Sequence, residues 1–174
     1  MSDREVLRRR GARVLVVDAA GRVLLVRAVD PDTPDAPFWF TVGGGVEAGE
    51  SDRAAAVREL REETGLVVAE GDLVGPVHAG QDAFAFGRWW IEQSNVFFAV
   101  RLPPAAAPAD VDAVPGEVAE LQIRAWWTVE ELRRHVAGRG DGGPGRPGEP
   151  VYPADLPDVV ESALAALGRA SRLR

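Results

Sequence analysis

Residues 44–66 read GGVEAGESDRAAAVRELREETGL, and this stretch decides the fold. Its second half favours a helix, because Ser51 can cap the first turn and Gly65 can adopt the left-handed conformation that ends a helix. The glycines before Ser51 permit positive φ angles and a close approach of the backbone. The sequence therefore predicts a strand, a glycine-rich loop and a helix over residues 51–64.

Three glutamates of this predicted helix share one face. At about 100° per residue, Glu59, Glu62 and Glu63 fall within an arc of about 100°. Leu60 lies beside that arc, on the side that would pack against a sheet. A solvated acidic surface is one interpretation. The other is a divalent-cation site, because Mg²⁺ and Mn²⁺ prefer oxygen ligands and Arg58 alone cannot balance three partly shielded carboxylates.

The amino-acid composition excludes several kinds of catalysis and of metal site. The 174-residue chain has no cysteine, and all 20 of its basic residues are arginine, which excludes thiolate catalysis, cysteine-bound metals and Schiff-base lysines. Its two histidines cannot form a three-histidine metal site. The net charge of −7 disfavours stable nucleic-acid binding. An anionic protein that handles phosphates is expected to do so through a divalent metal.

The spacing within residues 44–66 resembles the Nudix box, G-x5-E-x7-R-E-U-x-E-E-x-G-U, where U is a bulky aliphatic residue. The matching positions are Gly44, Glu50, Arg58, Glu59, Leu60, Glu62, Glu63, Gly65 and Leu66. The resemblance covers roughly residues 11–170. It implies an α/β (α+β) architecture, the Nudix fold, in which a mixed β-sheet is sandwiched between α-helices.

The resemblance also implies roles for residues of the box. The ligands implied for Mg²⁺ or Mn²⁺ are Glu59, Glu62, Glu63 and the backbone carbonyl of Gly43. The residues implied to hold the loop and orient those ligands are Gly44, Glu50 and Arg58. Glu59 is the preferred general base, and Glu117 and Glu120, which lie outside the box, are the alternatives.

Residues outside the box are expected to bind the substrate. Arg27 ends a predicted strand and resembles the arginine that contacts a substrate phosphate in such proteins. Trp39 is a candidate for stacking on a nucleobase, with core packing as the alternative. The other candidates for this role are Phe84, Phe86, Trp89 and the predicted loop at 103–116.

The expected function is a metal-dependent hydrolase that cleaves a diphosphate linkage in a small nucleoside diphosphate derivative. A metal lowers the pKa of a bound water molecule, and a carboxylate takes the proton of that water. The water is therefore expected to attack the phosphate directly. One alternative is a non-catalytic sensor of nucleotide ligands on the same fold. Another is an isoprenoid diphosphate isomerase, although the resembling isomerases use a cysteine. The residues leave open which nucleotide is bound.

A single domain is predicted over residues 11–170, after a flexible or edge segment at 1–10. The Gly/Pro-rich segment 138–150 is expected to be a solvated loop that is dispensable for chemistry. No apolar run approaches the ~18 residues of a membrane span, and no signal peptide is recognised. A cytoplasmic protein without membrane contact is the simplest expectation, and a homodimer is possible.

The remaining elements follow from local patterns. The strands predicted are 13–17, 22–27, 38–42, 66–69, 73–79, 83–86, 91–100 and 121–127, and the further helices are 128–136 and 155–170. Residues 30–37 contain three prolines and are predicted to form a loop. The glycines at 43–45 are predicted to break the strand at 38–42.

Overall fold

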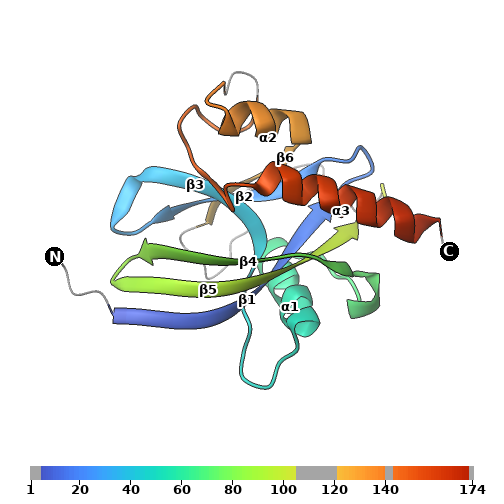
Figure 1. Ribbon diagram of the computed structural model, residues 1–174, viewed down its shortest axis with the longest axis horizontal. Coiled ribbons are helices and arrows are strands. Elements are labelled where there is room, and N and C mark those ends of the chain that lie inside the picture. The colour runs from blue at the N-terminus through green and yellow to red at the C-terminus, as the bar shows by residue number, and fades with distance from the viewer. Residues whose placement is uncertain (1–4, 105–120, 140–142, 173–174) are drawn as a thin grey trace.

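The computed structural model of the protein describes residues 5–104, 121–139 and 143–172 (Figure 1). Its strands are β1 (Glu5–Val17), β2 (Val23–Asp30), β3 (Thr33–Gly45), β4 (Val74–Phe86), β5 (Trp89–Arg101), β6 (Leu121–Trp127) and β7 (Val151–Tyr152). The helices are α1 (Asp52–Thr64), α2 (Val129–Val136) and α3 (Leu156–Ser171), with a 3-10 turn at Glu70–Asp72.

The described strands form one mixed sheet in the order β4-β5-β1-β2-β3-β7, and β6 pairs with β2. Parallel pairing joins β1 to β5 along their whole length, from Glu5 opposite Trp89 to Val17 opposite Arg101. The neighbouring β4–β5 and β2–β3 pairs are antiparallel. Helices cover both sides of the sheet, which confirms the predicted mixed sheet between helices.

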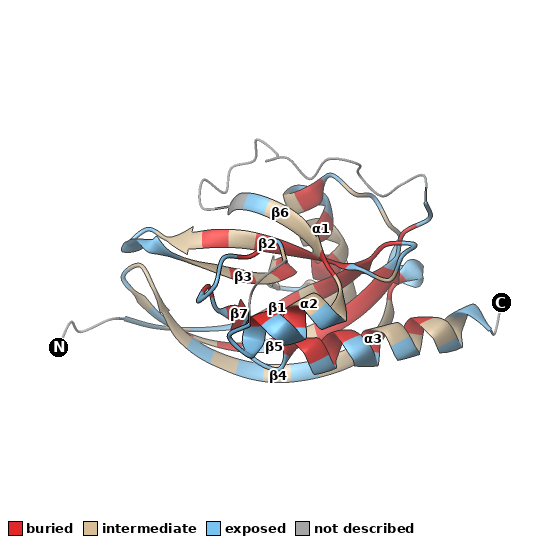
Figure 2. Cartoon of the chain, turned by 90° about the horizontal axis from the view of Figure 1, so that it is seen from above, coloured by how far each residue is buried: buried red, intermediate tan, exposed pale blue. Residues whose placement is uncertain are grey.

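The sheet separates two hydrophobic cores, and β1 contributes to both because its side chains alternate between faces. Val14 and Val16 pack with Leu60 of α1 in one core. Leu15 packs with Leu156 of α3 in the other. Figure 2, seen from above, shows α1 on one side of the sheet and α3 along the opposite side.

Helix α1 begins and ends where the sequence predicts. The Ser51 hydroxyl accepts a hydrogen bond from the Ala54 N–H at 3.1 Å. Gly65 has φ 74°, and its N–H donates to the Arg61 carbonyl at 2.8 Å. Backbone groups at both ends of the helix therefore have hydrogen-bond partners. Because the ends are determined by nearby residues, so are the positions of the glutamates along the helix.

Two segments predicted to be irregular are strands. The predicted loop at 30–37 is reduced to a two-residue turn, because Thr33 already pairs with Asp30. The ladder shifts register after Ala28, and such a bulge tolerates prolines that cannot donate a hydrogen bond. Likewise, β3 does not break at residues 43–45, because these glycines pair with β1.

The segment 1–10 was predicted to be flexible or an edge, and over residues 5–10 it is an edge of the sheet. These residues form the first part of β1 and pair with β5, and the Arg10 carbonyl also accepts a hydrogen bond from the Val46 N–H at 2.9 Å. Residues 66–69 are not a strand, and the strands predicted at 73–79 and 83–86 are one continuous strand, β4. The two-residue strand β7 was not predicted.

Candidate active site

Helix α1 turns two of its glutamates toward a cavity and the third away from it. Glu59 and Glu63 line the cavity, and the Glu59 side chain is only 15% exposed. The Glu62 side chain is 58% exposed and pairs with Arg58, one helical turn earlier, at 3.2 Å. Of the three glutamates predicted to bind a metal, the structure therefore brings two to the cavity and leaves one on the outer surface of the helix.

Gly44 makes room for Glu59. A Cβ atom on Gly44 would lie 2.5 Å from the Glu59 Cδ and 2.6 Å from both carboxylate oxygens. Any side chain at this position would displace the carboxylate. The glycine at the start of the box therefore determines where Glu59 lies.

Glu63 lies against β3. Its Oε2 accepts a hydrogen bond from the Gly43 N–H at 2.9 Å. Desolvation raises the pKa of Glu63 to about 7, although the Gly43 N–H and the Arg13 guanidinium favour the charged form; Glu59 adds repulsion. A cation bound beside Glu63 would therefore favour its charged form and release a proton near neutral pH.

Arg58 holds the loop that precedes the helix. Its Nε and Nη2 atoms each lie 3.0 Å from a carboxylate oxygen of Glu50, and Nη2 also donates to the Gly45 carbonyl at 2.9 Å. Nη1 donates to Glu59 at 2.8 Å. Hydrogen bonds from Arg58 lower the pKa of Glu50. The guanidinium thus ties loop to helix, the arrangement expected of residues that orient metal ligands.

Arg13, on β1, supplies a second cation that the sequence analysis did not single out. Its Nη1 donates to the Gly43 carbonyl and, at 3.4 Å, to the Thr41 carbonyl. Its guanidinium lies 5.6 Å from the centre of the Phe40 ring. Desolvation lowers the pKa of Arg13, and the charge of Glu63 opposes this. A metal ion at the Gly43 carbonyl would compete with Arg13 for that oxygen.

The donor atoms fit a hard divalent cation. Glu59, Glu63 and the Gly43 carbonyl offer oxygen only, which Mg²⁺ and Mn²⁺ prefer. Within the described residues, however, no three His, Asp or Glu side chains converge closely enough to hold a metal ion. Arg58 keeps Glu62 on the outer surface of the helix. Binding would therefore have to complete the set of ligands, with Glu62 as the third carboxylate.

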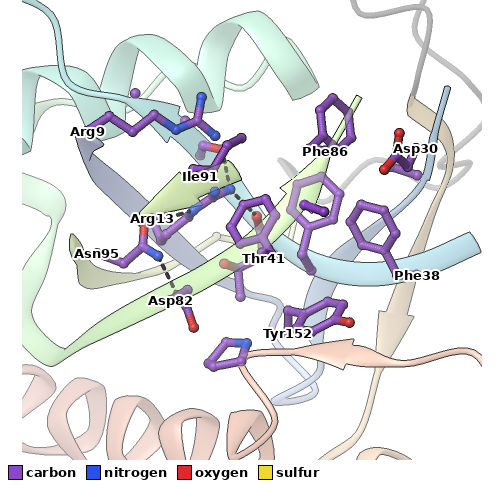
Figure 3. Close-up of a pocket in the computed structure, with 18 of the residues that line it drawn as sticks. Arg9, Arg13, Asp30, Phe38, Thr41, Asp82, Phe86, Ile91, Asn95 and Tyr152 are labelled. Carbon is purple, nitrogen blue, oxygen red and sulfur yellow. Dashed lines mark hydrogen bonds between the residues drawn. The ribbon is translucent and has the colours of Figure 1, made fainter. Parts of the chain in front are cut away.

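A cavity of about 690 Å³ runs from the carboxylates to a group of aromatic side chains (Figure 3). The aromatic residues that line it are Phe38, Phe40, Phe84, Phe86, Trp89, Phe97 and Tyr152. The Phe38 and Tyr152 rings meet edge to face, with centroids 5.7 Å apart. This end of the cavity suits a flat, apolar ring. Phe84, Phe86 and Trp89, the predicted candidates for base stacking, are among these lining residues.

A polar network borders the cavity, and Arg9, Asn95 and Asp82 of this network line it. Arg9 donates to Gln93, and Gln93 donates to Asn95. The Asn95 Nδ2 then donates to Asp82 at 2.6 Å (Figure 3). Gly11 leaves the space for it, because a Cβ there would lie 2.2 Å from the Asn95 Oδ1. The sequence analysis missed this network, since its members come from three strands and share no spacing.

The structure places Trp39 and Arg27, both predicted to bind the substrate, outside the cavity lining. Trp39 is 1% exposed, its ring meets Trp127 at 5.1 Å, and its indole N–H donates to Glu149 at 2.7 Å. Arg27 forms a buried ion pair with the same carboxylate at 2.7 Å. Neither residue is among those that line the cavity. Side chains alternate along β3, so Phe38 faces the cavity and Trp39 faces the core.

The segment 138–150 is only partly the loop that was predicted. Its described residues form no helix or strand. Glu149, however, is buried, which contradicts the expectation of a purely solvated segment. The alternative bases Glu117 and Glu120, and most of the predicted loop at 103–116, lie outside the described residues.

Known proteins share this fold and this motif. The sequence matches the NUDIX domain over residues 7–144. A solved structure, the MutT protein from Methanosarcina mazei Go1, has a TM-score of 0.58 and 21% identity, covering 94% of this chain and 96% of that chain. The fold and the complete glutamate motif define a Nudix protein. The chain belongs to the Nudix hydrolase family.

Two curated relatives carry names that refer to pyrophosphate bonds. An RNA pyrophosphohydrolase of Erythrobacter litoralis is 29% identical over 142 residues, 76% of this chain and 84% of that protein. A putative 8-oxo-dGTP diphosphatase of Bacillus subtilis is 42% identical over 65 residues, 37% of this chain and 40% of that protein. The match thus spans less than half of the Bacillus subtilis relative.

Helices of the described residues are either too short or too polar to cross a membrane.

Proposed function

We propose that the protein is a metal-dependent hydrolase that cleaves a diphosphate linkage in a nucleoside diphosphate derivative by direct attack of water. The observation that carries this proposal is the cavity itself, which joins Glu59 and Glu63 at one end to a group of aromatic rings at the other. A nucleotide has the same division between a charged diphosphate and a flat base. The names of the relatives support hydrolysis of a pyrophosphate bond.

Glu59, Glu62 and Glu63, with the Gly43 carbonyl, are the proposed ligands of Mg²⁺ or Mn²⁺. When bound, such an ion neutralises phosphate charge and lowers the pKa of a water molecule that it holds. Glu62 reaches the ion only after its exposed contact with Arg58 breaks, and this pairing is weak enough to exchange.

Glu59 is the proposed general base. It lines the cavity, and Gly44 and Arg58 fix its carboxylate from two sides. A base must lie within hydrogen-bond reach of the attacking water, so a held carboxylate suits this role. Glu117 and Glu120 stay as alternative bases.

Two arginines supply positive charge along the cavity. Arg9 and Arg13 both line it. Their guanidinium groups suit the oxygens of a diphosphate.

The alternatives are less well supported. A sensor without turnover has no need for all three box carboxylates, and the sequence retains them. An isomerase of the resembling type uses a cysteine, and the chain has none. Action in the cytoplasm, the absence of stable nucleic-acid binding and a possible homodimer stay predictions.

The decisive experiment is a substrate panel with purified protein and Mg²⁺, followed by product mass. The panel contains ordinary and oxidised nucleoside triphosphates, dinucleoside polyphosphates, nucleoside diphosphate sugars and isopentenyl diphosphate. In ¹⁸O water, a hydrolase adds one labelled oxygen to a product phosphate. Glu59→Gln is the matched inactive control. Binding without any product, or a product of unchanged mass, contradicts the proposal.

A further inference from the structure

Glu149 has a more complete set of partners than an ordinary loop residue. Its Oε1 accepts hydrogen bonds from the Arg27 Nη2 at 2.7 Å and Nε at 3.1 Å. Its Oε2 accepts from the Trp39 indole N–H at 2.7 Å and from the Arg146 backbone N–H at 3.2 Å. Both oxygens of the carboxylate are therefore held, by donors on β2, on β3 and in its own loop.

The pairing is buried on both sides. The Glu149 and Arg27 side chains are 7% and 13% exposed. Burial raises the pKa of Glu149, but the hydrogen bonds from Arg27, Trp39 and the Arg146 backbone outweigh this and leave the pKa below its usual value. The carboxylate stays charged at neutral pH. Loss of one partner would leave the other charge buried and uncompensated.

The backbone around Glu149 is also held by hydrogen bonds, to the side chain of His135 and to the backbone of β3. The His135 Nε2 lies 2.7 Å from the Glu149 carbonyl oxygen, at hydrogen-bond distance. The Trp39 backbone N–H donates to the Pro150 carbonyl at 2.8 Å. Tyr152 then pairs with Phe40 across β3 and β7. The carboxylate thus lies at the start of a short segment that is attached along the edge of β3.

That short segment forms one side of the substrate cavity. Pro150, Tyr152 and Pro153 line it, and the Tyr152 ring lies against Phe38. Figure 3 shows Tyr152 beside the cavity, near Phe38. The core on one face of β3 is therefore linked to the aromatic end of the cavity on the other face.

We propose that Glu149 is a positioning residue for the substrate cavity. Its carboxylate, held by Arg27 and Trp39, fixes the wall formed by Pro150, Tyr152 and Pro153, and so sets the shape of the aromatic end that receives the base. The assignment of that end to a base rests on the proposed function. Glu149 acts on binding of the substrate and not on the chemical step, because Tyr152 lies against Phe38, whereas Glu63 lies against Gly43, five residues further along β3.

The first test compares Glu149→Gln with Asp18→Asn. Asp18 is also a buried carboxylate that pairs with an arginine, Arg22 at 2.7 Å, but it lies in the β1–β2 turn and does not line the cavity. Both variants should lose thermal stability. Only Glu149→Gln should raise KM for the best substrate, by about tenfold, which corresponds to about 1.4 kcal/mol. Its kcat should stay close to wild type.

A second comparison separates a positioning role from direct phosphate binding by Arg27. If the two residues act as one pair, Arg27→Gln should raise KM as Glu149→Gln does, and the double variant should add little. Additive losses would mean that Arg27 binds the substrate independently. That result would overturn the proposal.

Amide hydrogen exchange tests the wall without any turnover. The Val151 and Tyr152 amides should exchange faster in Glu149→Gln than in wild type, and should be unchanged in Asp18→Asn. If Glu149→Gln fails to fold, Trp39→Phe removes only one donor to the carboxylate and should give a smaller increase in amide exchange.

If no substrate of the panel is hydrolysed but exchange is faster in Glu149→Gln, only the proposed function is refuted. Unchanged exchange, or an equal KM rise in Asp18→Asn, refutes the positioning role.

Discussion

Removing the charge of Glu63 should stabilise the metal-free protein strongly at pH 8.5 and much less at pH 5. Desolvation raises the pKa of Glu63 to about 7, whereas a glutamate in the unfolded chain titrates near ~4.3. Between these values the folded state keeps a proton that the unfolded state has released. The free energy of unfolding therefore falls as the pH rises from about 4.5 through about 7, and changes little beyond.

The magnitude follows from the size of this pKa difference. A difference of ~2.5 pKa units corresponds to about 3.5 kcal/mol once both states are deprotonated. About 1 kcal/mol of this is already lost at pH 5, so the wild type should lose ~2.5 kcal/mol between pH 5 and pH 8.5. The Glu63→Gln variant would keep the hydrogen bond from the Gly43 N–H, because the amide oxygen of the new side chain can accept it.

Urea unfolding in excess EDTA at both pH values measures this effect in wild type and in Glu63→Gln. The variant should show almost none of the pH-dependent loss that Glu63 causes. Glu130→Gln, on the exposed side of α2, controls for the change in net charge. If wild type and Glu63→Gln differ by the same amount at pH 5 and pH 8.5, within ~0.5 kcal/mol, the assignment of the buried charge to Glu63 is refuted.

Other perturbations test the metal and the base. Excess EDTA should abolish turnover, and full activity in EDTA would exclude the metal mechanism. Glu59→Gln should lower kcat by ~10²–10⁴-fold with little recovery at high Mg²⁺, since it removes the proposed base. If the variant keeps the kcat of the wild type, another residue is the base. Glu62→Gln should lose less, and a titration with Mg²⁺ should restore most of its activity. Gly44→Ala puts a Cβ 2.5 Å from the Glu59 Cδ, so metal affinity measured by calorimetry should fall by ~10-fold or more while the melting temperature changes little.

Local patterns sufficed for the motif because all of its parts lie within one helix and the loop before it. Ser51 and Gly65 determine where α1 begins and ends, and the helical repeat then places Glu59 and Glu63 one turn apart on one side. The same reasoning did not show that Glu62 lies outside the cavity. Which edge of an acidic stripe is covered depends on how α1 packs against β3, and that is a tertiary property.

The substrate-binding residues could not be predicted in the same way. Alternation along β3 indicates that Phe38 and Trp39 face opposite sides, but not which side holds the cavity. Trp39 and Arg27 meet Glu149 across 110 and 122 residues of chain. No local spacing encodes such a contact. A buried acid in a Gly/Pro-rich segment looks, in sequence, like any solvated one.

Strand prediction failed where pairing with neighbouring strands accommodates prolines and glycines, because such pairing cannot be read from the local sequence. Residues 30–37 pair at a bulge, and the glycines at 43–45 pair with β1 while leaving space for Glu59. Both segments lie beside the candidate site. Propensity therefore misleads where a strand must also make room for a carboxylate or a ligand.

The division of the interior by the sheet bears on how this protein can change over evolution. Among the described residues, the core under α1 includes Leu60, next to the candidate carboxylates Glu59 and Glu63, whereas the core under α3, around Leu156 and Val160, contains no residue of α1. Substitutions under α3 can therefore tune heat resistance while the chemistry stays constant, and their effects should add to those of changes at the box. Adaptation to a new growth temperature and change at the carboxylates of α1 can therefore proceed on opposite faces of the same sheet.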